Sequence, residues 1–195
     1  MWFQEQGKRG GYYNFRGESL ERAFLASPME LTRVTSGFSM RMHPIHQTWR
    51  AHKGVDYGAP TGAPVRTVAD GRVEFASTMG GYGNVVQIDH GKGDTTLYAH
   101  LSRIDVRQGG VVERGQRIGA VGSTGWSTGP HLHFEFRENG VHRDPLEVAR
   151  ARATQGVALS VAARPDFDRA SVALRGQLAA AAAQVTGQTQ VASAR

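Results

Sequence analysis

Two short runs rich in β-branched residues flank an Asp-Gly pair in the stretch Ala63-Pro64-Val65-Arg66-Thr67-Val68-Ala69-Asp70-Gly71-Arg72-Val73-Glu74-Phe75-Ala76. Asp-Gly between such runs is a strong signal for a tight β-hairpin, because both residues tolerate the positive φ angles of the turn. The sequence therefore predicts a hairpin that turns at Asp70-Gly71.

Similar short runs, separated by turns that contain glycine, follow this stretch at close spacing. They are Asn84–His90, Thr95–Leu101, Val111–Val112, Ile118–Gly122 and His131–Phe136. Glycine is abundant, with 25 of the 195 residues, which favours a fold with many tight turns. The prediction is a mainly β protein, with an antiparallel β-sheet domain over residues 31–149.

The flanks of this domain differ from it in composition and in residue spacing. Residues 1–30 form a lead-in from a possible upstream domain, with a short strand at Tyr12-Tyr13 and a short helix predicted from the spacing of Leu20 and Phe24. Residues 150–195 form an Ala-rich helical extension, in which Phe167, Ala170, Leu174 and Leu178 follow helical spacing. Thr186–Arg195 are small and polar, and are predicted to be a disordered tail.

Composition excludes several classes of protein. The chain has no run of about twenty apolar residues, which excludes a membrane span, and no cysteine, which excludes disulfides and thiolate metal sites. The net charge is +6, but no dense Lys/Arg run occurs, so a nucleic-acid partner is disfavoured. The first residues lack the apolar stretch of a secretory signal, so either the protein is cytosolic or a signal lies upstream.

Two groups of metal-binding residue types stand out. The first is His52-Lys53-Gly54-Val55-Asp56, and the second is Gly129-Pro130-His131-Leu132-His133-Phe134-Glu135. Residues two apart in a strand point to the same face, so His131 and His133 project together; an extended segment would likewise put His52 and Asp56 on one side. Each motif is weak alone, but together they supply three or four groups that suit zinc. Spacing leaves open which member of the His-x-His pair would bind the metal.

Several ordered motifs resemble those of the lysostaphin-type zinc endopeptidases, which hydrolyse peptidoglycan. The resemblance runs from about Ser36 to Pro145 and rests on Ser36–Pro44, His52–Asp56, Gly81–Asn84, Tyr98–Leu101, Gly115–Gly119 and Gly122–Glu135. It implies an antiparallel β-sheet domain with a groove walled by loops. It is closest to the D,D-endopeptidases of the Gram-negative envelope.

The resemblance also implies roles for individual residues. His52, Asp56 and His133 would bind one Zn²⁺ per chain, and His100 and His131 would be the catalytic pair. Arg41 and Asn84 would line the groove and bind substrate.

The substrate implied by the resemblance is peptidoglycan, in the periplasm or cell envelope. The lead-in from Tyr12 to Pro28 is similar to the region before the catalytic domain in Gram-negative members, which cut the cross-link from D-Ala to diaminopimelate. Pentaglycine bridges are the other substrate of the family. Upstream domains or a regulatory partner would lie outside this chain.

Two other functions compete with a peptidase. A catalytically inactive wall-binding or amidase-activator module of the same fold would lack metal ligands, whereas all five His and Asp positions are present here. A lipoyl- or biotin-carrier domain needs a lysine at a hairpin tip, and none of Lys8, Lys53 and Lys92 stands in a suitable turn.

Overall fold

The computed structural model describes residues 1–5, 10–22, 24–30, 33–42, 49–152 and 156–192. They form two compact units, one made of residues 1–23 with 155–195 and the other of residues 24–154. The second unit extends beyond the predicted domain of residues 31–149 at both ends. One reason is that Met29 is buried in its core, with Phe24 and Leu25 packed against that core.

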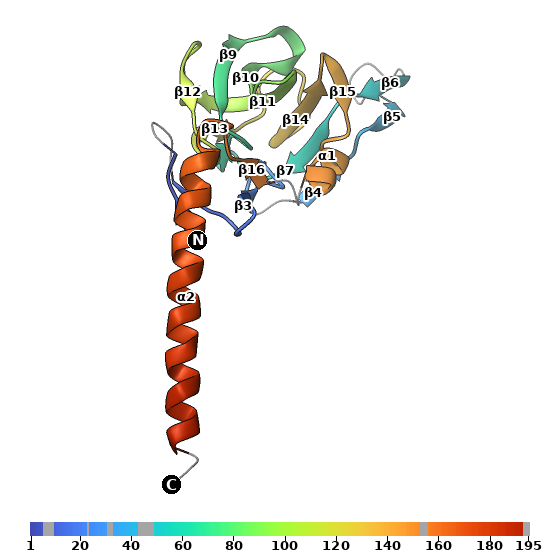
Figure 1. Cartoon of the computed structure of the whole chain (residues 1–195). Helices are drawn as coiled ribbons and strands as arrows, with labels where there is room; N and C mark the ends of the chain where they lie inside the picture. The colour runs from blue at the N-terminus through green and yellow to red at the C-terminus, as the bar shows by residue number, and fades with distance from the viewer. Residues whose placement is uncertain (6–9, 23, 31–32, 43–48, 153–155, 193–195) are drawn as a thin grey trace. The chain divides into compact units, whose positions relative to one another are not determined.

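A ten-stranded antiparallel sheet forms the framework of the second unit (Figure 1). Its main path runs in the order β12 (Val111–Val112), β9 (Gly71–Thr78), β10 (Asn84–Asp89), β11 (Asp94–Ile104), β14 (His131–Glu138), β7 (Val55–Gly58) and β4 (Arg33–Ser36). Off this path, β13 (Arg117–Val121) pairs with β11 and β8 (Pro64–Arg66), and β15 (Val141–Arg143) pairs with β14. The predicted fold class, mainly β with an antiparallel sheet, is confirmed.

Four further elements complete this unit. Strands β5 (Ser39–Met42) and β6 (Trp49–His52) form a separate antiparallel pair. The 3₁₀ turn η1 (Gly80–Tyr82) connects β9 to β10, and helix α1 (Pro145–Arg152) follows β15. Arg152 of α1 forms ion pairs with Asp94 and Glu138 of the sheet, so this short helix is an integral part of the unit.

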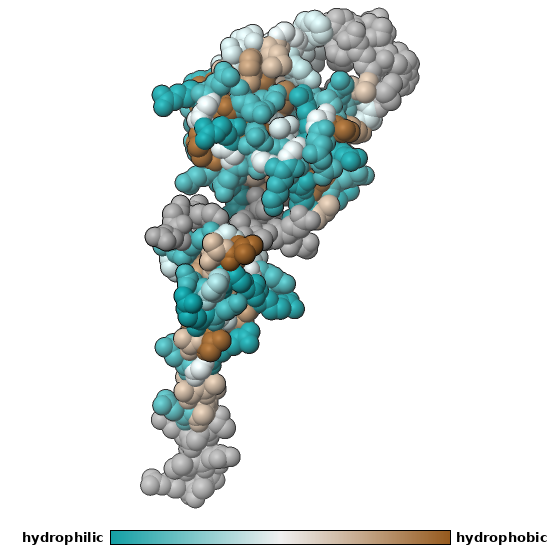
Figure 2. Space-filling model, turned by 45° about the horizontal axis from the view of Figure 1, so that its top comes forward, coloured by the Kyte–Doolittle hydropathy of each residue, from teal (hydrophilic) through white to brown (hydrophobic). Residues whose placement is uncertain are grey.

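The central strands bury side chains on both faces. On β10, Val86 and Ile88 belong to the main core, whereas Val85 belongs to a smaller cluster with Leu97 and Ala99 of β11. Each fully buried aliphatic side chain of this kind contributes about 1.5–3 kcal/mol. The visible face of the unit in Figure 2 is mainly hydrophilic, with apolar residues scattered among polar ones. The short apolar runs of the sequence therefore supply the core that fixes the sheet.

The predicted hairpin at Asp70-Gly71 is wrong, because its two strands do not pair with each other. Strand β8 pairs with β13, and β9 pairs with β10 and β12. The segment between them is held by more distant groups: the Thr67 amide donates to the Gln116 carbonyl, and the Arg114 amide donates to the Asp70 carboxylate. Long-range pairing therefore overrides the local turn signal. A true Asn-Gly hairpin joins β14 to β15 at Asn139-Gly140, with φ angles of 50° and 78°.

The first unit combines small strand pairs with a long helix. Strand β1 (Trp2–Phe3) pairs with β2 (Gly11–Tyr12), and β3 (Glu18–Arg22) pairs with β16 (Gly156–Ala158). Helix α2 spans Arg164–Ala192. The rings of Phe3, Tyr13 and Phe167 pack edge to face, with centroids 5.2–6.3 Å apart. This aromatic cluster joins the N-terminal segment to the start of helix α2 within one unit.

Two predictions for the flanks are wrong. The helix expected around Leu20 is strand β3, because pairing with β16 supplies backbone hydrogen bonds that a single helical turn cannot match. The helix predicted around Phe167–Leu178 is present, but it continues to Ala192 through residues expected to be disordered. Alanine and glutamine are good helix formers, and extending an existing helix is easier than starting one. Among the described residues, no helix is both long and apolar enough to cross a membrane.

Candidate metal centre

Strand pairing brings the two sequence motifs together. His133 of β14 lies directly opposite Asp56 of β7 in the antiparallel register, and His131 lies opposite Gly58. Side chains at directly opposite positions are about 5 Å apart at their Cβ atoms. The register of this pair therefore brings an imidazole from one motif against the carboxylate of the other.

A bend at Lys53-Gly54 brings His52 to the same place. His52 ends β6 and Asp56 lies in β7, so the two do not share one extended strand as expected. A Cβ atom on Gly54 would lie 2.3 Å from the Phe134 carbonyl oxygen and 3.0 Å from the His133 ring. Only glycine permits this close approach, which explains the glycine between the histidine and the aspartate.

Three potential ligand atoms converge in the buried site. The Oδ1 atom of Asp56 lies 3.0 Å from Nε2 of His52 and 2.8 Å from Nδ1 of His133, and the two nitrogens are 3.1 Å apart. These are the three residues of the described chain whose side chains together could hold a metal ion.

The outer nitrogen of each imidazole is bound to a hydrogen-bond acceptor. Nδ1 of His52 donates to the Gly37 carbonyl at 2.7 Å, and Nε2 of His133 donates to Oε1 of Glu135 at 3.2 Å. In these neutral tautomers, the inner nitrogens and the Asp56 oxygen all direct lone pairs at one another. One proton can bridge one pair of such atoms, whereas one cation can bind all three. The site therefore fits a metal ion, with two imidazoles and one carboxylate as ligands. The Gly37 carbonyl and Glu135 would orient the two rings.

Electrostatics keep the carboxylate of this site ionised. Burial acts to raise the pKa of Asp56, but hydrogen bonds from His133 and His52 outweigh it and hold that pKa well below its usual range. A metal ligand must be in its deprotonated form, and Asp56 meets this condition.

His100 and His131 lie beside the three converging atoms, with their ring centroids 4.8 Å apart. Nδ1 of His131 donates to the Gly129 carbonyl and Nδ1 of His100 donates to the Thr124 carbonyl, both at 2.8 Å. These bonds leave Nε2 of each neutral ring as a proton acceptor. Nε2 of His131 is 3.9 Å from Oδ1 of Asp56.

An irregularity in β11 places His100. The residue has a φ of 59°, in the left-handed region that favours glycine, and the pairing with β10 shifts register between Val86 and Asn84. A bulge of this kind redirects a side chain, and such strain is concentrated at functional sites. Burial lowers the pKa of His100 to about 4, so the ring is neutral near pH 7.

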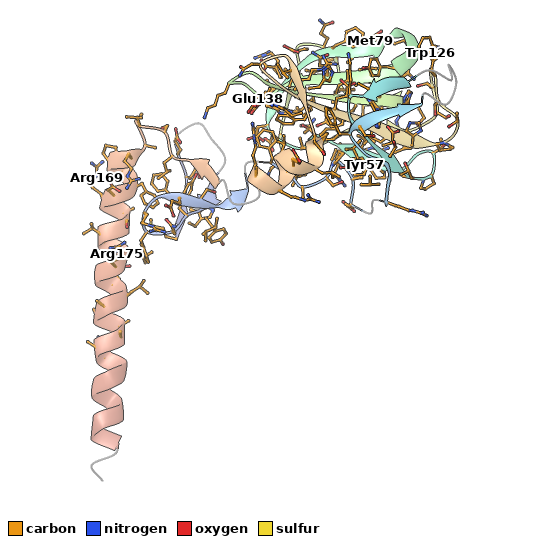
Figure 3. The ribbon with its side chains drawn as sticks, turned by 90° about the vertical axis from the view of Figure 1, so that its right-hand side faces the viewer. Tyr57, Met79, Trp126, Glu138, Arg169 and Arg175 are labelled. Atoms are coloured by element: carbon orange, nitrogen blue, oxygen red, sulfur yellow. The ribbon has the colours of Figure 1, made fainter. Side chains whose placement is uncertain are left out.

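An open cavity of about 520 Å³ lies over these residues, and Tyr82 and Trp126 contribute to its walls. Trp126 is half exposed, and its ring packs against Gly81, where a Cβ atom would lie 2.6 Å from it. Figure 3 shows Trp126 at the same end of the unit as Met79, which precedes the η1 turn. The histidines are therefore accessible to a ligand through a cavity with aromatic walls.

The two residues predicted to bind substrate are not placed in this cavity by the structure. Arg41 lies in β5, and its side chain is outside the described residues. Asn84 uses its amide to brace the bulge: Nδ2 donates to the Leu101 carbonyl, and Oδ1 accepts from the Thr78 hydroxyl. Substrate binding by both residues stays a prediction.

Sequence reasoning missed the partners around Glu135. The Tyr82 hydroxyl donates to the Glu135 carboxylate, and Nε2 of His142 lies 3.0 Å from its second oxygen. Glu135 is two residues after His133 in the same strand, so alternation alone puts both side chains on one face. That spacing was the available signal for Glu135, whereas Tyr82 and His142 come from other elements.

Comparison with known proteins identifies a family and several relatives of this chain. The sequence model of peptidase family M23 matches residues 50–145. DD-carboxypeptidase/endopeptidase Mpg of Neisseria meningitidis is 55% identical over 126 residues, which are 65% of this chain and 29% of that protein. Peptidoglycan DD-endopeptidase ShyC of Vibrio cholerae is 43% identical over 152 residues, which are 76% of this chain and 35% of that protein. The chain thus spans about a third of the length of these relatives.

This chain is also similar to a solved structure. The catalytic domain of lysostaphin from Staphylococcus simulans superposes with a TM-score of 0.56 and 31% identity, over 61% of this chain and 92% of that domain.

Proposed function

This chain belongs to peptidase family M23, and from that premise we propose that it is a zinc-dependent endopeptidase acting on the peptide cross-links of peptidoglycan. The observation that carries the proposal is the convergence of one ligand-type atom each from His52, Asp56 and His133, with the rings of His100 and His131 beside them.

Zinc is the metal that best suits these ligands. Calcium and magnesium prefer sites made of oxygen atoms, whereas two imidazoles and one carboxylate are a typical catalytic zinc set. Zinc held by His52, Asp56 and His133 would lower the pKa of water and polarise a carbonyl group. We propose one zinc ion per chain.

His100 and His131 supply the proton transfers. Each ring donates from Nδ1 to a backbone carbonyl, so each presents Nε2 as a base. One of them accepts a proton from the attacking water and returns it to the leaving amine, a contribution of about a hundredfold to ten-thousandfold in rate. A ring that has taken up a proton can also donate to the developing oxyanion.

The proposed bond is the one from D-Ala to diaminopimelate, which joins two D-configured centres. The DD-endopeptidase names of the relatives support this choice over pentaglycine bridges. Peptidoglycan lies outside the cytoplasm, so the proposed location is the periplasm. Recovery of the native protein from the cytosolic fraction would contradict that location.

Digestion of purified sacculi tests the activity. Zinc-loaded protein should convert cross-linked muropeptide dimers into monomers, as measured by mass spectrometry, and should leave pentaglycine-bridged sacculi intact. Protein treated with a chelator is the control. Zinc-loaded protein that binds sacculi without releasing monomers would instead favour the inactive wall-binding or amidase-activator module.

Residues 155–195 and 1–23 should be dispensable for the chemistry, because every residue of the candidate site lies in the other unit. A fragment of residues 24–154 should fold, bind one zinc ion and cleave muropeptides. Its rate should be within about threefold of that of the full chain, because changes outside buried networks usually alter free energies by only about 0.5 kcal/mol. The cut belongs after residue 154, because a cut after Arg150 would remove Arg152 from its ion pairs with Asp94 and Glu138.

Elemental analysis and cleavage assays on the fragment check this prediction. A fragment that is folded and zinc-loaded but inactive would mean that the smaller unit takes part in substrate binding or catalysis.

A further inference from the structure

The carboxylate of Glu135 is fully buried next to the candidate metal centre, yet it is not one of the three converging ligands. Burial acts against the charged form, but donors from His133, Tyr82 and Arg137 outweigh it and lower the pKa of Glu135 to about 2. A buried charge of this kind requires several hydrogen bonds to be tolerated.

Four side chains surround this carboxylate, and they are divided between its two oxygens. Oε1 accepts from Nε2 of His133 at 3.2 Å and from the Tyr82 hydroxyl at 2.6 Å. Oε2 accepts from the Arg137 guanidinium at 2.6 Å, and Nε2 of His142 lies 3.0 Å from it. An ion pair with Arg137 alone would neutralise the charge of Glu135. Because each oxygen also has its own donors, Oε1 is the oxygen that faces His133.

We propose that Glu135 is a positioning residue, which holds His133 in the tautomer that presents Nδ1 to the metal. The carboxylate accepts the Nε2 proton of His133, so the lone pair of that ring must lie on Nδ1, beside Asp56 and His52. Partners of this kind fix the orientation of a ligating histidine and increase its basicity, and their loss typically costs 10–100-fold in metal affinity. The inference rests on the metal site of the proposed function, and not on the reaction.

Tyr82 and Arg137 keep the carboxylate in this orientation. Arg137 carries only donors, so Oε2 must remain an acceptor. Burial, together with the charge of Glu135, raises the pKa of Tyr82 far above its usual value, so its hydroxyl remains a donor to Oε1. Both oxygens of Glu135 therefore act as acceptors, with Arg137 at Oε2 and with Tyr82 and His133 at Oε1.

Glu135→Gln is the direct test, because the amide has one acceptor and one donor group. Arg137 must face the amide oxygen, which turns the NH₂ group towards Nε2 of His133. That contact favours a lone pair on Nε2 and a proton on Nδ1, the wrong tautomer for the metal. The Kd for Zn²⁺ should rise by about 10–100-fold, as measured by competition with a chromophoric chelator. Thermal unfolding should show that the variant is folded.

Glu138→Gln is the matched control. Glu138 lies on the same strand, but its carboxylate binds Arg143 and Arg152 rather than a histidine, and Figure 3 shows it at the end of the unit away from Trp126. The substitution makes the same change in charge, and the Kd for Zn²⁺ should stay within about twofold of the unmodified protein, the spread of a typical surface substitution. A folded Glu135→Gln protein with an equally unchanged Kd would overturn the proposal.

A measurement on the unmodified protein covers the case in which Glu135→Gln does not fold. In ¹⁵N-histidine NMR spectra of zinc-loaded protein, His133 should carry its proton on Nε2, in a hydrogen bond that slows exchange with water. A proton on Nδ1, or a fast-exchanging proton on Nε2, would overturn the proposal. Both readouts are independent of cleavage, so a zinc-binding protein that cuts no peptidoglycan would contradict the proposed function alone.

Discussion

Replacing His133 by alanine is expected to abolish metal binding and peptidoglycan cleavage together. His133 supplies one of three converging ligand atoms, so His133→Ala leaves a site with two protein ligands, and metal affinity depends on the number and geometry of ligands. The variant also leaves Asp56 and Glu135 without the ring that lies between their carboxylates. Zinc content should fall from one equivalent per chain to the background of the buffer.

Elemental analysis after dialysis, together with the digestion of sacculi, checks this result. Cleavage should fall to the uncatalysed rate, and added zinc in moderate excess should not restore it. Thermal unfolding separates loss of the site from loss of the fold. A folded His133→Ala protein that retains one equivalent of zinc would remove His133 from the ligand set.

Replacing His131 or His100 by alanine is expected to separate the two effects, with zinc retained and cleavage lost. Neither ring contributes one of the three converging atoms, and each presents Nε2 as a proton acceptor. Cleavage should fall by about two to four orders of magnitude, the usual contribution of a positioned acid or base. That fall corresponds to about 2.7–5.4 kcal/mol of transition-state stabilisation.

His131→Ala and His133→Ala form a matched pair, because the two residues project from the same face of β14. A His131→Ala protein that loses its zinc would show that the metal ligand and the catalytic residue of the His-x-His pair are reversed. A His100→Ala protein with intact zinc and nearly normal cleavage would remove His100 from the mechanism.

Local patterns in the sequence determined most strands of the central sheet and the resemblance to a known family. The apolar runs at Asn84–His90 and Thr95–Leu101 were long enough to bury side chains on both faces, and both are strands in the structure. Alternation within one strand also put His131 and His133 on one face, because that relation depends only on the backbone of β14. The resemblance to the lysostaphin-type zinc endopeptidases rests on motifs of the same local kind.

Relations between elements were decided by the tertiary structure. The Asp70-Gly71 pair carries a hairpin signal, yet β8 pairs with β13, because pairing across the sheet outweighs one favourable turn. His52 reaches Asp56 through a bend that Gly54 permits, and His100 reaches the site through a bulge with a φ of 59°. The contact between Glu135 and Tyr82 joins residues 53 positions apart in the chain. Periodicity relates neighbours along one strand, whereas register, bulges and side-chain networks depend on which distant segments meet in the folded core.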